Sequence, residues 1–548
     1  MGKMIRFFSW GIISLMLVSC KSKDNYGDFT SNADGGEIVF VASDIAVNSL
    51  TKSRIKPLNG IGNGPLYGYG NGRFTIDATA YFEDLNIPVI RYHDVEYFNK
   101  QNRAINISAI FPDAQADESS ASSYYFEATD RLLEAAMHTG AKVIYRLGEN
   151  VLNLGSATAN NTPPGDFDKW ARVAERIIAH YEDGWCDGYH YKGIMWEVWN
   201  EPEQIGSWAG SLESYAEFYK KVYLYIKEKH PNVDISPAHI GNKDKRERFY
   251  QYLSENDLGI EHCFAHYYAS DFSSIEDLAA ELEKDLKRFK LDADVIINEW
   301  NYLSSEDGWY NWAPTFYFIQ TQQGAAWYAK QLIHMQAAEN LAGAVYYASD
   351  MLGFWTGLYK RNSKGELVVL PAYDTFRYFG KLYNLGYEVK PDKVPEGIYV
   401  LAATDGKKEV GVMVVNDSEE SKEVDVRIKD VRLDECKIQV KSKKVQAADE
   451  EDSGLSDEEQ KRKGPKNRPK HTRKRIHQAK KNFLEKFKTV SKLITKRARF
   501  AYPNVSVFAA FGGRILPLSL GCGKRKEKKI SSFSEFYAKT VCALKSYL

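Results

Sequence analysis

Short apolar runs alternate with longer amphipathic stretches between residues 36 and 390. The apolar runs lie at residues 87–93, 141–145, 193–198, 233–236, 262–266, 295–297 and 343–347. Between them, stretches such as 166–181 and 212–229 carry apolar residues at the spacing of one helix face. Strands that alternate with helices predict a parallel sheet, and roughly eight such units in this length favour a closed barrel over an open sheet. The sequence therefore predicts a (β/α)8 TIM barrel, of the α/β class, at residues 36–390.

The pattern changes after residue 390. Residues 398–403, 409–415 and 424–428 have the short apolar character of antiparallel strands, and the Asp405-Gly406 dipeptide forms a favourable turn between the first two. Because no helical stretch separates these strands, residues 391–445 are predicted to form part of a small accessory β-sandwich. Residues 36–46 are also strand-like, and we consider them a candidate strand of the same sheet.

The first twenty residues have the pattern of an export signal. Lys3 and Arg6 precede an apolar run at 7–18 that is too short to span a bilayer. The run ends in Leu-Val-Ser-Cys, which resembles a bacterial lipobox whose cysteine, here Cys20, becomes lipidated. We therefore expect a signal peptide at 1–20, a flexible tether at 21–35, and an exported lipoprotein anchored to a membrane of a bacterial envelope, in the periplasm or at the cell surface. A plain signal peptide that is cleaved elsewhere is the alternative.

Charge is unevenly distributed, although the whole chain is neutral with 73 basic and 73 acidic side chains. Residues 441–548 hold 28 of the basic and 10 of the acidic side chains, a net charge of +18, so the preceding residues carry −18. An acidic body of this kind has no electrostatic reason to bind nucleic acid. At 446–548 the dense charge predicts disorder, and residues 480–500 have the spacing of a basic amphipathic helix. We favour a solvated tail without a role over one that binds a membrane surface or a partner.

The six cysteines are scattered along the chain, and their spacing matches neither a zinc site nor a disulfide framework. We expect no metal and no organic cofactor. The sequence leaves the oligomeric state open.

Two glutamates follow apolar runs in a way that surface glutamates rarely do. Glu201 lies in Trp-Glu-Val-Trp-Asn-Glu-Pro at 196–202, and Glu299 lies in Asn-Glu-Trp-Asn at 298–301. In a barrel, residues at the carboxyl ends of the strands meet at the active-site face. Cleavage of a glycosidic bond needs one protonated and one ionised carboxyl group. The sequence therefore predicts Glu201 and Glu299 as a catalytic pair.

The stretch around Glu201 resembles glycoside hydrolase family 39, a member of the large barrel clan A. The resemblance rests on the motif at 197–202 with Trp208 beyond it, and on the motif at 298–301. Arg-Tyr-His at 91–93 and Pro-Ala-Tyr at 371–373 resemble the end of the second strand and the last barrel helix of that family. The likeness spans roughly residues 37–426. Asn-Glu-Pro alone is shared across the clan, whereas the combination in this order is specific to the family.

The resemblance implies a retaining glycosidase, with Glu201 as general acid/base and Glu299 as nucleophile, spaced about 5–5.5 Å apart. It also implies substrate-binding residues, which are His93, Asn200, His266, Tyr268, Trp300, Asp350 and Trp355. Asn200 is expected to hydrogen-bond the sugar 2-hydroxyl, and ionised Glu299 is expected to help keep Glu201 protonated. Two residues depart from the family pattern. Asp94 stands where a small residue is usual, and Tyr268 stands where uronide-cleaving members carry a lysine.

A neutral-sugar substrate follows from Tyr268, with an exo-acting β-xylosidase as the leading hypothesis and an oligo- or polysaccharide as the partner. Another clan A activity, as an arabinosidase, a galactosidase or an endo-acting glycanase, is the second hypothesis. The third is a catalytically silent glycan-binding lipoprotein, which would be expected to lack one of the two carboxylates; both are present.

Overall fold

The computed structural model describes residues 8–9, 12–19, 36–40, 53–69, 72–93, 95, 104–149, 161–204, 206–304, 312–349, 355–362, 365–391, 394, 396–406, 409–417, 422–428, 437–444, 507–511 and 514–518. The chain forms two compact units, Met1–Gln446 and Ala447–Leu548. Among the described residues, no helix combines the length and the apolar character needed to cross a membrane.

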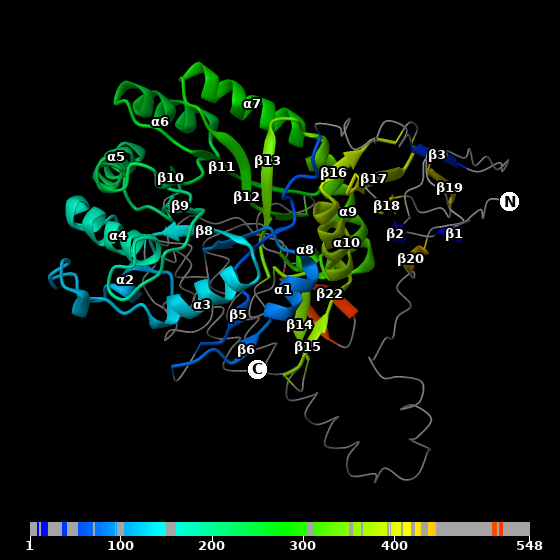
Figure 1. Ribbon diagram of the computed structural model, residues 1–548, viewed down its shortest axis with the longest axis horizontal. Coiled ribbons are helices and arrows are strands. Elements are labelled where there is room, and N and C mark those ends of the chain that lie inside the picture. Colours follow the sequence, from blue (N-terminus) through cyan, green and yellow to red (C-terminus); the bar gives the residue numbers. More distant parts are fainter. Residues whose placement is uncertain are drawn as a thin grey trace, which may run out of the picture. The chain divides into compact units, whose positions relative to one another are not determined.

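Eight parallel strands form the central sheet of the first unit, and each is followed by a helix (Figure 1). The strands are β4 (Gly60–Gly62), β7 (Val89–Tyr92), β8 (Lys142–Leu147), β9 (Ile194–Val198), β10 (Asp234–Pro237), β11 (His262–Ala269), β12 (Asp294–Tyr302) and β13 (Leu341–Tyr346). The corresponding helices are α1 (Thr79–Leu85), α3 (Glu127–His138), α4 (Phe167–Glu182), α5 (Leu212–Lys229), α6 (Lys243–Glu255), α7 (Ile275–Arg288), α9 (Gln322–Ala337) and α10 (Pro371–Leu385). The predicted (β/α)8 barrel is confirmed.

The helices begin where the sequence provides a cap. The Asp166 side chain accepts a hydrogen bond from the backbone of Lys169 at the start of α4, and Ser211 does the same at the start of α5. Each of these helices buries one apolar face against the sheet, with Trp170 of α4 and Tyr215 of α5 among the buried residues. The amphipathic stretches predicted at 166–181 and 212–229 match these two helices.

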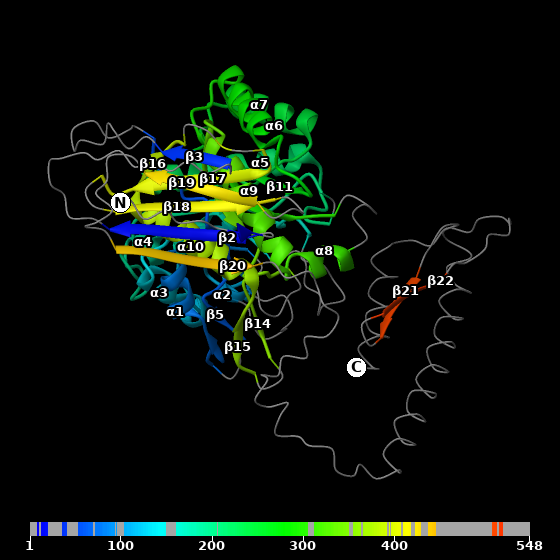
Figure 2. The same cartoon turned by 90° about the vertical axis from the view of Figure 1, so that its right-hand side faces the viewer.

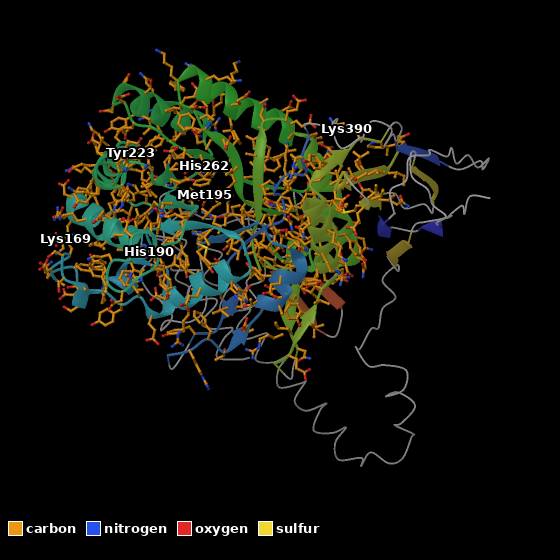
Figure 3. All side chains as sticks on the ribbon, in the orientation of Figure 1. Lys169, His190, Met195, Tyr223, His262 and Lys390 are labelled. Atoms are coloured by element: carbon orange, nitrogen blue, oxygen red, sulfur yellow. The ribbon has the colours of Figure 1, made fainter. Side chains whose placement is uncertain are left out.

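Inside the barrel, apolar side chains from successive strands fill the space between them. Ile144, Met195, Phe264 and Val345 are buried together, with Val89 and Ile296 against them. Figure 3 labels Met195 of β9 and, at the start of β11, His262. The interior is thus a packed core, as expected of a barrel of eight strands.

The sheet closes between β10 and β11 through side chains. These strands are the two ends of the hydrogen-bonded order, and no backbone ladder joins them among the described strands. Instead, the backbone N–H of His262 donates to Oγ of Ser236 at 2.8 Å, and His262 Nε2 lies 2.9 Å from Oδ2 of Asp234. We call this contact between Asp234, Ser236 and His262 the seam.

The remaining strands of the first unit form sheets beside the barrel (Figure 2). A five-stranded sheet has the order β16 (Tyr387–Val389), β17 (Ile398–Thr404), β18 (Glu409–Asn416), β2 (Ile12–Ser19) and β20 (Lys437–Lys444). A second sheet has the order β1 (Phe8–Ser9), β19 (Lys422–Ile428) and β3 (Gly36–Phe40). Helices α9 and α10 contact β17 and β18. The turn predicted at Asp405-Gly406 joins β17 and β18, with Gly406 at φ 70°.

Two sequence predictions about the beginning of the chain concern strands of these sheets. Within the segment expected as a strand at 36–46, residues 36–40 form β3, which pairs with β19, and residues 41–46 lie outside the described residues. Residues 12–19, expected within the signal peptide, form β2 between β18 and β20. Cys20 and the tether at 21–35 lie outside the described residues.

Shorter elements complete the first unit. They are the hairpins β5 (Leu66–Tyr67) with β6 (Ile76–Asp77) and β14 (Tyr359–Arg361) with β15 (Leu367–Val369), the helices α2 (Ile107–Ile110) and α8 (Trp312–Phe318), and a 3-10 turn at Ala121–Ser123. The described part of the second unit is an antiparallel hairpin of β21 (Val507–Phe511) and β22 (Arg514–Leu518), which the sequence did not lead us to expect. The remainder of 446–548, where disorder is predicted with a basic amphipathic helix pattern at 480–500, lies outside the described residues.

Candidate active site

Glu201 lies just beyond the carboxyl end of β9, in a segment with unusual backbone geometry. Trp199 and Glu201 both adopt the left-handed region, with φ of 74° and 42°. This conformation is rare for residues other than glycine and is costly, so it persists where packing enforces it. Trp199 is enforced in this way, because its ring is buried and stacks edge-on against Trp208 at 5.2 Å. The strained turn fixes the direction of the Asn200 and Glu201 side chains.

Glu299 lies on β12, and a bulge in that strand directs it. Ala265 pairs with Ile297 and His266 pairs with Glu299, so Asn298 is the extra residue. The bulge lets two successive side chains serve one site. Asn298 Nδ2 donates to Oε1 of Glu197 at 2.8 Å, while Glu299 turns toward His266 and Arg91.

The two predicted carboxyl groups meet around His266. A carboxylate oxygen of Glu201, one of Glu299 and a ring nitrogen of His266 all lie within 4.8 Å of one another. His266 Nδ1 is 2.8 Å from Oε1 of Glu201, and its Nε2 is 3.6 Å from Oε2 of Glu299. The Glu201 side chain is 25% exposed and that of Glu299 is 10% exposed. The separation is close to the ~5–5.5 Å of retaining glycosidases and below the ~6.5–9.5 Å that inverting enzymes need for a water.

Arg91 joins Glu299 to a third carboxylate. From the end of β7, its Nε and Nη2 bind both oxygens of Glu197 at 2.8 and 3.1 Å. Its Nη1 donates to Oε2 of Glu299 at 2.8 Å, and its Nη2 also donates to Oδ1 of Asn200 at 3.0 Å. Arg91 and Glu197 are completely buried. A buried guanidinium satisfied by this many acceptors holds the site rigidly, because each lost partner would leave a buried charge.

Burial and charge set the ionisation of these groups. Burial would raise the pKa of Glu299, but the charges of His266 and Arg91 and the hydrogen bonds from Tyr268 and Arg91 lower it below the ordinary value. Burial would lower the pKa of His266, but Glu299 and Glu201 raise it. Burial and the charge of Arg91 hold the pKa of His93 well below its ordinary value. The site therefore favours the ionised form of Glu299, which suits attack, together with the protonated form of His266 and the neutral form of His93.

Tyr268 and Trp355 stand on one side of Glu299. The Tyr268 hydroxyl donates to Oε1 of Glu299 at 2.6 Å. The Trp355 ring packs edge-on against Tyr268 at 5.6 Å and against Phe316 at 5.1 Å. His93 is buried at the end of β7, and its ring lies 6.3 Å from that of Tyr347.

Trp300 is a correction to the predicted set of substrate-binding residues. Its ring is fully buried among aromatic side chains between the sheet and the helices, which are Phe272, Trp327, Tyr328, Tyr346 and Phe376. Side chains alternate along a strand, so the residue after Glu299 points away from the barrel axis. Trp300 supports the strand instead of binding the sugar. Asp94 and Asp350 lie outside the described residues.

Sequence reasoning missed several members of the site. Glu197, Asn298, His239 and Glu203 were not singled out, and Arg91 was noticed only as part of a family motif. Arg91 and Glu197 carried a signal, because a charged residue inside an otherwise apolar strand has to be paired when buried. His239 follows β10 without such a pattern.

Glu201, His266 and Glu299 offer one ligand atom each at a spacing that suits a metal ion. The hydrogen bond between His266 and Glu201 and the ion pair of Glu299 with Arg91 already engage these groups.

Comparison with known proteins finds two β-xylosidases that match part of this chain. No protein-family model matches the chain. A β-xylosidase of Geobacillus stearothermophilus is 22% identical over 174 residues, which are 29% of this chain and 34% of that enzyme. A β-xylosidase of Caldicellulosiruptor saccharolyticus is 24% identical over 200 residues, 33% of this chain and 41% of the enzyme. The matched segments thus span well under half of these relatives.

Solved structures share the fold at low identity. A glucosidase from Croceicoccus marinus has a TM-score of 0.53 at 18% identity, over 67% of this chain and 75% of that chain. A family 39 enzyme from Xanthomonas axonopodis pv. citri has a TM-score of 0.50 at 15% identity, over 70% of this chain and 75% of that chain. At these identities the likeness shows that the barrel fold is shared.

Proposed function

We propose that this chain is a retaining glycoside hydrolase of family 39, with Glu201 as the general acid/base and Glu299 as the nucleophile. The observation that carries the proposal is the approach of the two carboxylates within 4.8 Å, at the carboxyl ends of β9 and β12. The barrel fold and the two β-xylosidase relatives support it as well.

The reaction proceeds in two displacements at one carbon. In the first, Glu299 attacks the anomeric carbon while Glu201 gives its proton to the glycosidic oxygen, so the bond to the leaving alcohol breaks. In the second, Glu201 takes a proton from water, the water oxygen attacks the same carbon, and Glu299 is released as a carboxylate. Arg91, Tyr268 and His266 stabilise the charge that returns to Glu299.

We propose a neutral sugar as the substrate, with a β-xyloside as the first choice. Tyr268 occupies the position at which uronide-cleaving family members carry a lysine, and its hydroxyl is engaged by Glu299. With Arg91 also bound to carboxylates, neither group offers a free positive charge to a sugar carboxylate. The names of the two sequence relatives point the same way.

The test is hydrolysis of a panel of nitrophenyl glycosides by the wild type, Glu201→Ala and Glu299→Gln. We expect cleavage of the β-xyloside with retained anomeric configuration in the first product seen by NMR. Glu299→Gln should be inactive. Glu201→Ala should lose about 10²–10⁴-fold with leaving groups that need protonation, and less with nitrophenolate, which departs without it.

Glu175→Gln is the matched control, because Glu175 is also a buried carboxylate, paired with His230 away from the site. It should keep wild-type kcat. Normal activity in Glu299→Gln would overturn the nucleophile assignment. If the panel is not cleaved but oligosaccharides are, the exo-acting role fails while the chemistry stands.

We also propose that Cys20 carries a lipid that anchors the protein to a membrane of a bacterial envelope. The support is the basic start, the apolar run and the Leu-Val-Ser-Cys ending. Cleavage before Cys20 would remove β1 and β2 from the two accessory sheets. In the anchored form, β18 and β20 would therefore lack the strand that lies between them. Cys20→Ser should move the protein from the membrane to the soluble fraction of cells; unchanged membrane partition would contradict a lipid at this position.

A further inference from the structure

A second histidine lies directly behind His266. His239 follows β10, and its ring stacks on that of His266 with centroids 4.5 Å apart and planes 29° from parallel. The His239 side chain also hydrogen-bonds the backbone of Phe264, on the same strand as His266. His239 is thus held against β11 by its ring face and by a polar contact.

Glu203 braces the turn that carries His239. Its Oε1 accepts the backbone N–H of Gly241 at 2.7 Å, and its backbone carbonyl accepts a hydrogen bond from Lys245 at 2.9 Å. A Cβ placed on Gly241 would lie only 2.9 Å from Nε2 of His239 and 3.3 Å from Oε1 of Glu203. Glu203, two residues after Glu201, is thus bonded to Gly241, which lies close to the ring of His239. His239 in turn stacks on His266, which pairs with Glu201.

The orientation of His266 is decisive for the acid/base. Only one rotation of its ring directs Nδ1 at Glu201 and Nε2 toward Glu299. The ring of His239 covers one face of the His266 ring, so it blocks rotation of the His266 side chain toward that face. Charged and titratable groups face His266 from several elements, which are Arg91 on β7, His93 just after it, Glu201 and Glu203 after β9, His239 after β10, Tyr268 on β11 and Glu299 on β12.

We infer that His239 is a positioning residue that holds His266 between the two carboxylates, so that Glu201 and His266 share the proton used in catalysis. The inference rests on the proposed glycosidase function. A proton on Nδ1 of His266 is hydrogen-bonded to Oε1 of Glu201, and its transfer along that bond gives protonated Glu201 and neutral His266. Of the two stacked histidines, His266 is the one that holds the proton, because burial and the charge of His266 hold the pKa of His239 well below its ordinary value.

The first experiment measures the proton itself and needs no activity. The titration of His266 is followed by NMR of histidine-labelled protein, with the resonance assigned by His266→Gln. In the wild type, His266 should titrate above the ordinary histidine value of 6.5. His239→Ala should move its titration toward 6.5, and His239→Phe, which keeps a flat neutral ring, should restore the wild-type value. An unchanged titration in His239→Ala overturns the inference.

The second experiment follows the pH profile of kcat. His239→Ala should lower kcat with little change in KM and should move the basic limb to lower pH, because a His266 ring that is no longer held between the carboxylates loses its proton at lower pH. His239→Phe should restore both. A fall in kcat with an unmoved basic limb would show a merely structural role and overturn the inference.

His334→Phe is the matched control, since His334 also packs on a ring, that of Tyr399 at 5.5 Å, but lies on α9. It should leave both readouts unchanged. If the NMR result is as expected while no glycoside is cleaved, the proposed function fails and the positioning of His266 stands. Both readouts unmoved in a folded His239→Ala would leave the glycosidase and remove the inference.

Discussion

A histidine pairs with a carboxylate at the beginning of the barrel strands and again at their carboxyl ends, and the two pairs have different roles. At the seam, His262 at the start of β11 lies 2.9 Å from Asp234 at the start of β10. At the carboxyl ends of the strands, Glu201, His266 and Glu299 meet in a region that we call the mouth. There, His266, further along β11, lies 2.8 Å from Glu201. The ring, the carboxylate and the distance are nearly the same, so local geometry alone does not tell a structural pair from a chemical one.

The surroundings make the difference. At the seam, one carboxylate meets one histidine, and the pair supplies a contact where the backbone ladder stops. At the mouth, Glu197, Glu201 and Glu299 share two basic groups, Arg91 and His266, so the carboxylates outnumber their partners. A surplus of negative charge in a buried place raises the affinity of the cluster for a proton, which is what an acid/base site requires.

The largest expected effect comes from removing the charge at the centre of the mouth. Arg91→Met leaves Glu197 and Glu299 buried without their main partner, and breaking a buried ion pair in this way costs about 3–5 kcal/mol. We expect that loss in the free energy of unfolding measured with urea, together with loss of glycoside cleavage. A variant as stable as the wild type would contradict the network.

Arg246→Met provides the comparison outside the mouth. Arg246 is also buried and pairs with the buried Asp285 at 2.9 Å and with the partly exposed Glu281 at 2.6 Å. It should lower stability but leave the pH profile of the remaining folded enzyme unchanged. Loss of activity per folded molecule in this variant would mean that the loss in Arg91→Met is not specific to the contacts of Arg91 with Glu197 and Glu299.

A smaller effect is expected from a single hydrogen bond at the mouth. Tyr268→Phe removes the hydroxyl that donates to Glu299 at 2.6 Å. A hydrogen bond to a charged group contributes about 1.5–3 kcal/mol, which corresponds to about a 10–100-fold loss of kcat if the bond stabilises the departing carboxylate. Because this bond lowers the pKa of Glu299, the acid limb of the kinetic profile should also move to higher pH. An acid limb at its wild-type position would argue against this role.

The sequence predicted the barrel and the catalytic pair because both leave local patterns. Seven strands were visible as apolar runs, and Glu201 and Glu299 follow two of them. The eighth strand, β4, was missed because it is three residues long and two of these are glycines. The glycine at position 60 is required by packing between strands, because a Cβ there would lie only 2.7 Å from the carbonyl oxygen of Ala344.

The parts of the site that were not predicted depend on contacts between distant segments. His239 gains its role only by lying on His266, and the bulge at Asn298 is set by pairing with β11. Trp300 was assigned to the sugar because it adjoins Glu299, although strand alternation sends its ring into the core. Seam residues show the same limit, because no pattern in Asp234 or His262 marks the place where the ladder ends.

At the seam, a comparable change should affect stability alone. His262→Ala removes the contact with Asp234, worth about 1.5 kcal/mol for a hydrogen bond to a charged group. We expect a fall of that size in the free energy of unfolding, with kcat and its pH profile unchanged. The matched variant His266→Ala should do the reverse, losing kcat by more than it loses stability. A change in the kinetic pH profile of His262→Ala would remove the distinction between the two pairs.

The smallest expected effect is the pH dependence of stability at the mouth, where two shifts act in opposite directions. The pKa of Glu299 is lowered in the folded protein, so its contribution is present above the ordinary carboxyl value of 4.5 and is lost as pH falls through the folded value. The pKa of His266 is raised, so its contribution is complete below 6.5 and is lost as pH rises through its folded value. Stability should therefore decline on both sides of a mildly acidic plateau.

In urea unfolding followed from about pH 3 to 9, Glu299→Gln should flatten both declines, because it removes one shifted group and the charge that shifts the other. His266→Gln should flatten the basic side and leave a weaker acidic one, since Arg91 and Tyr268 still lower the pKa of Glu299. Equal declines in all three proteins would mean that the charge surplus is balanced by groups other than these.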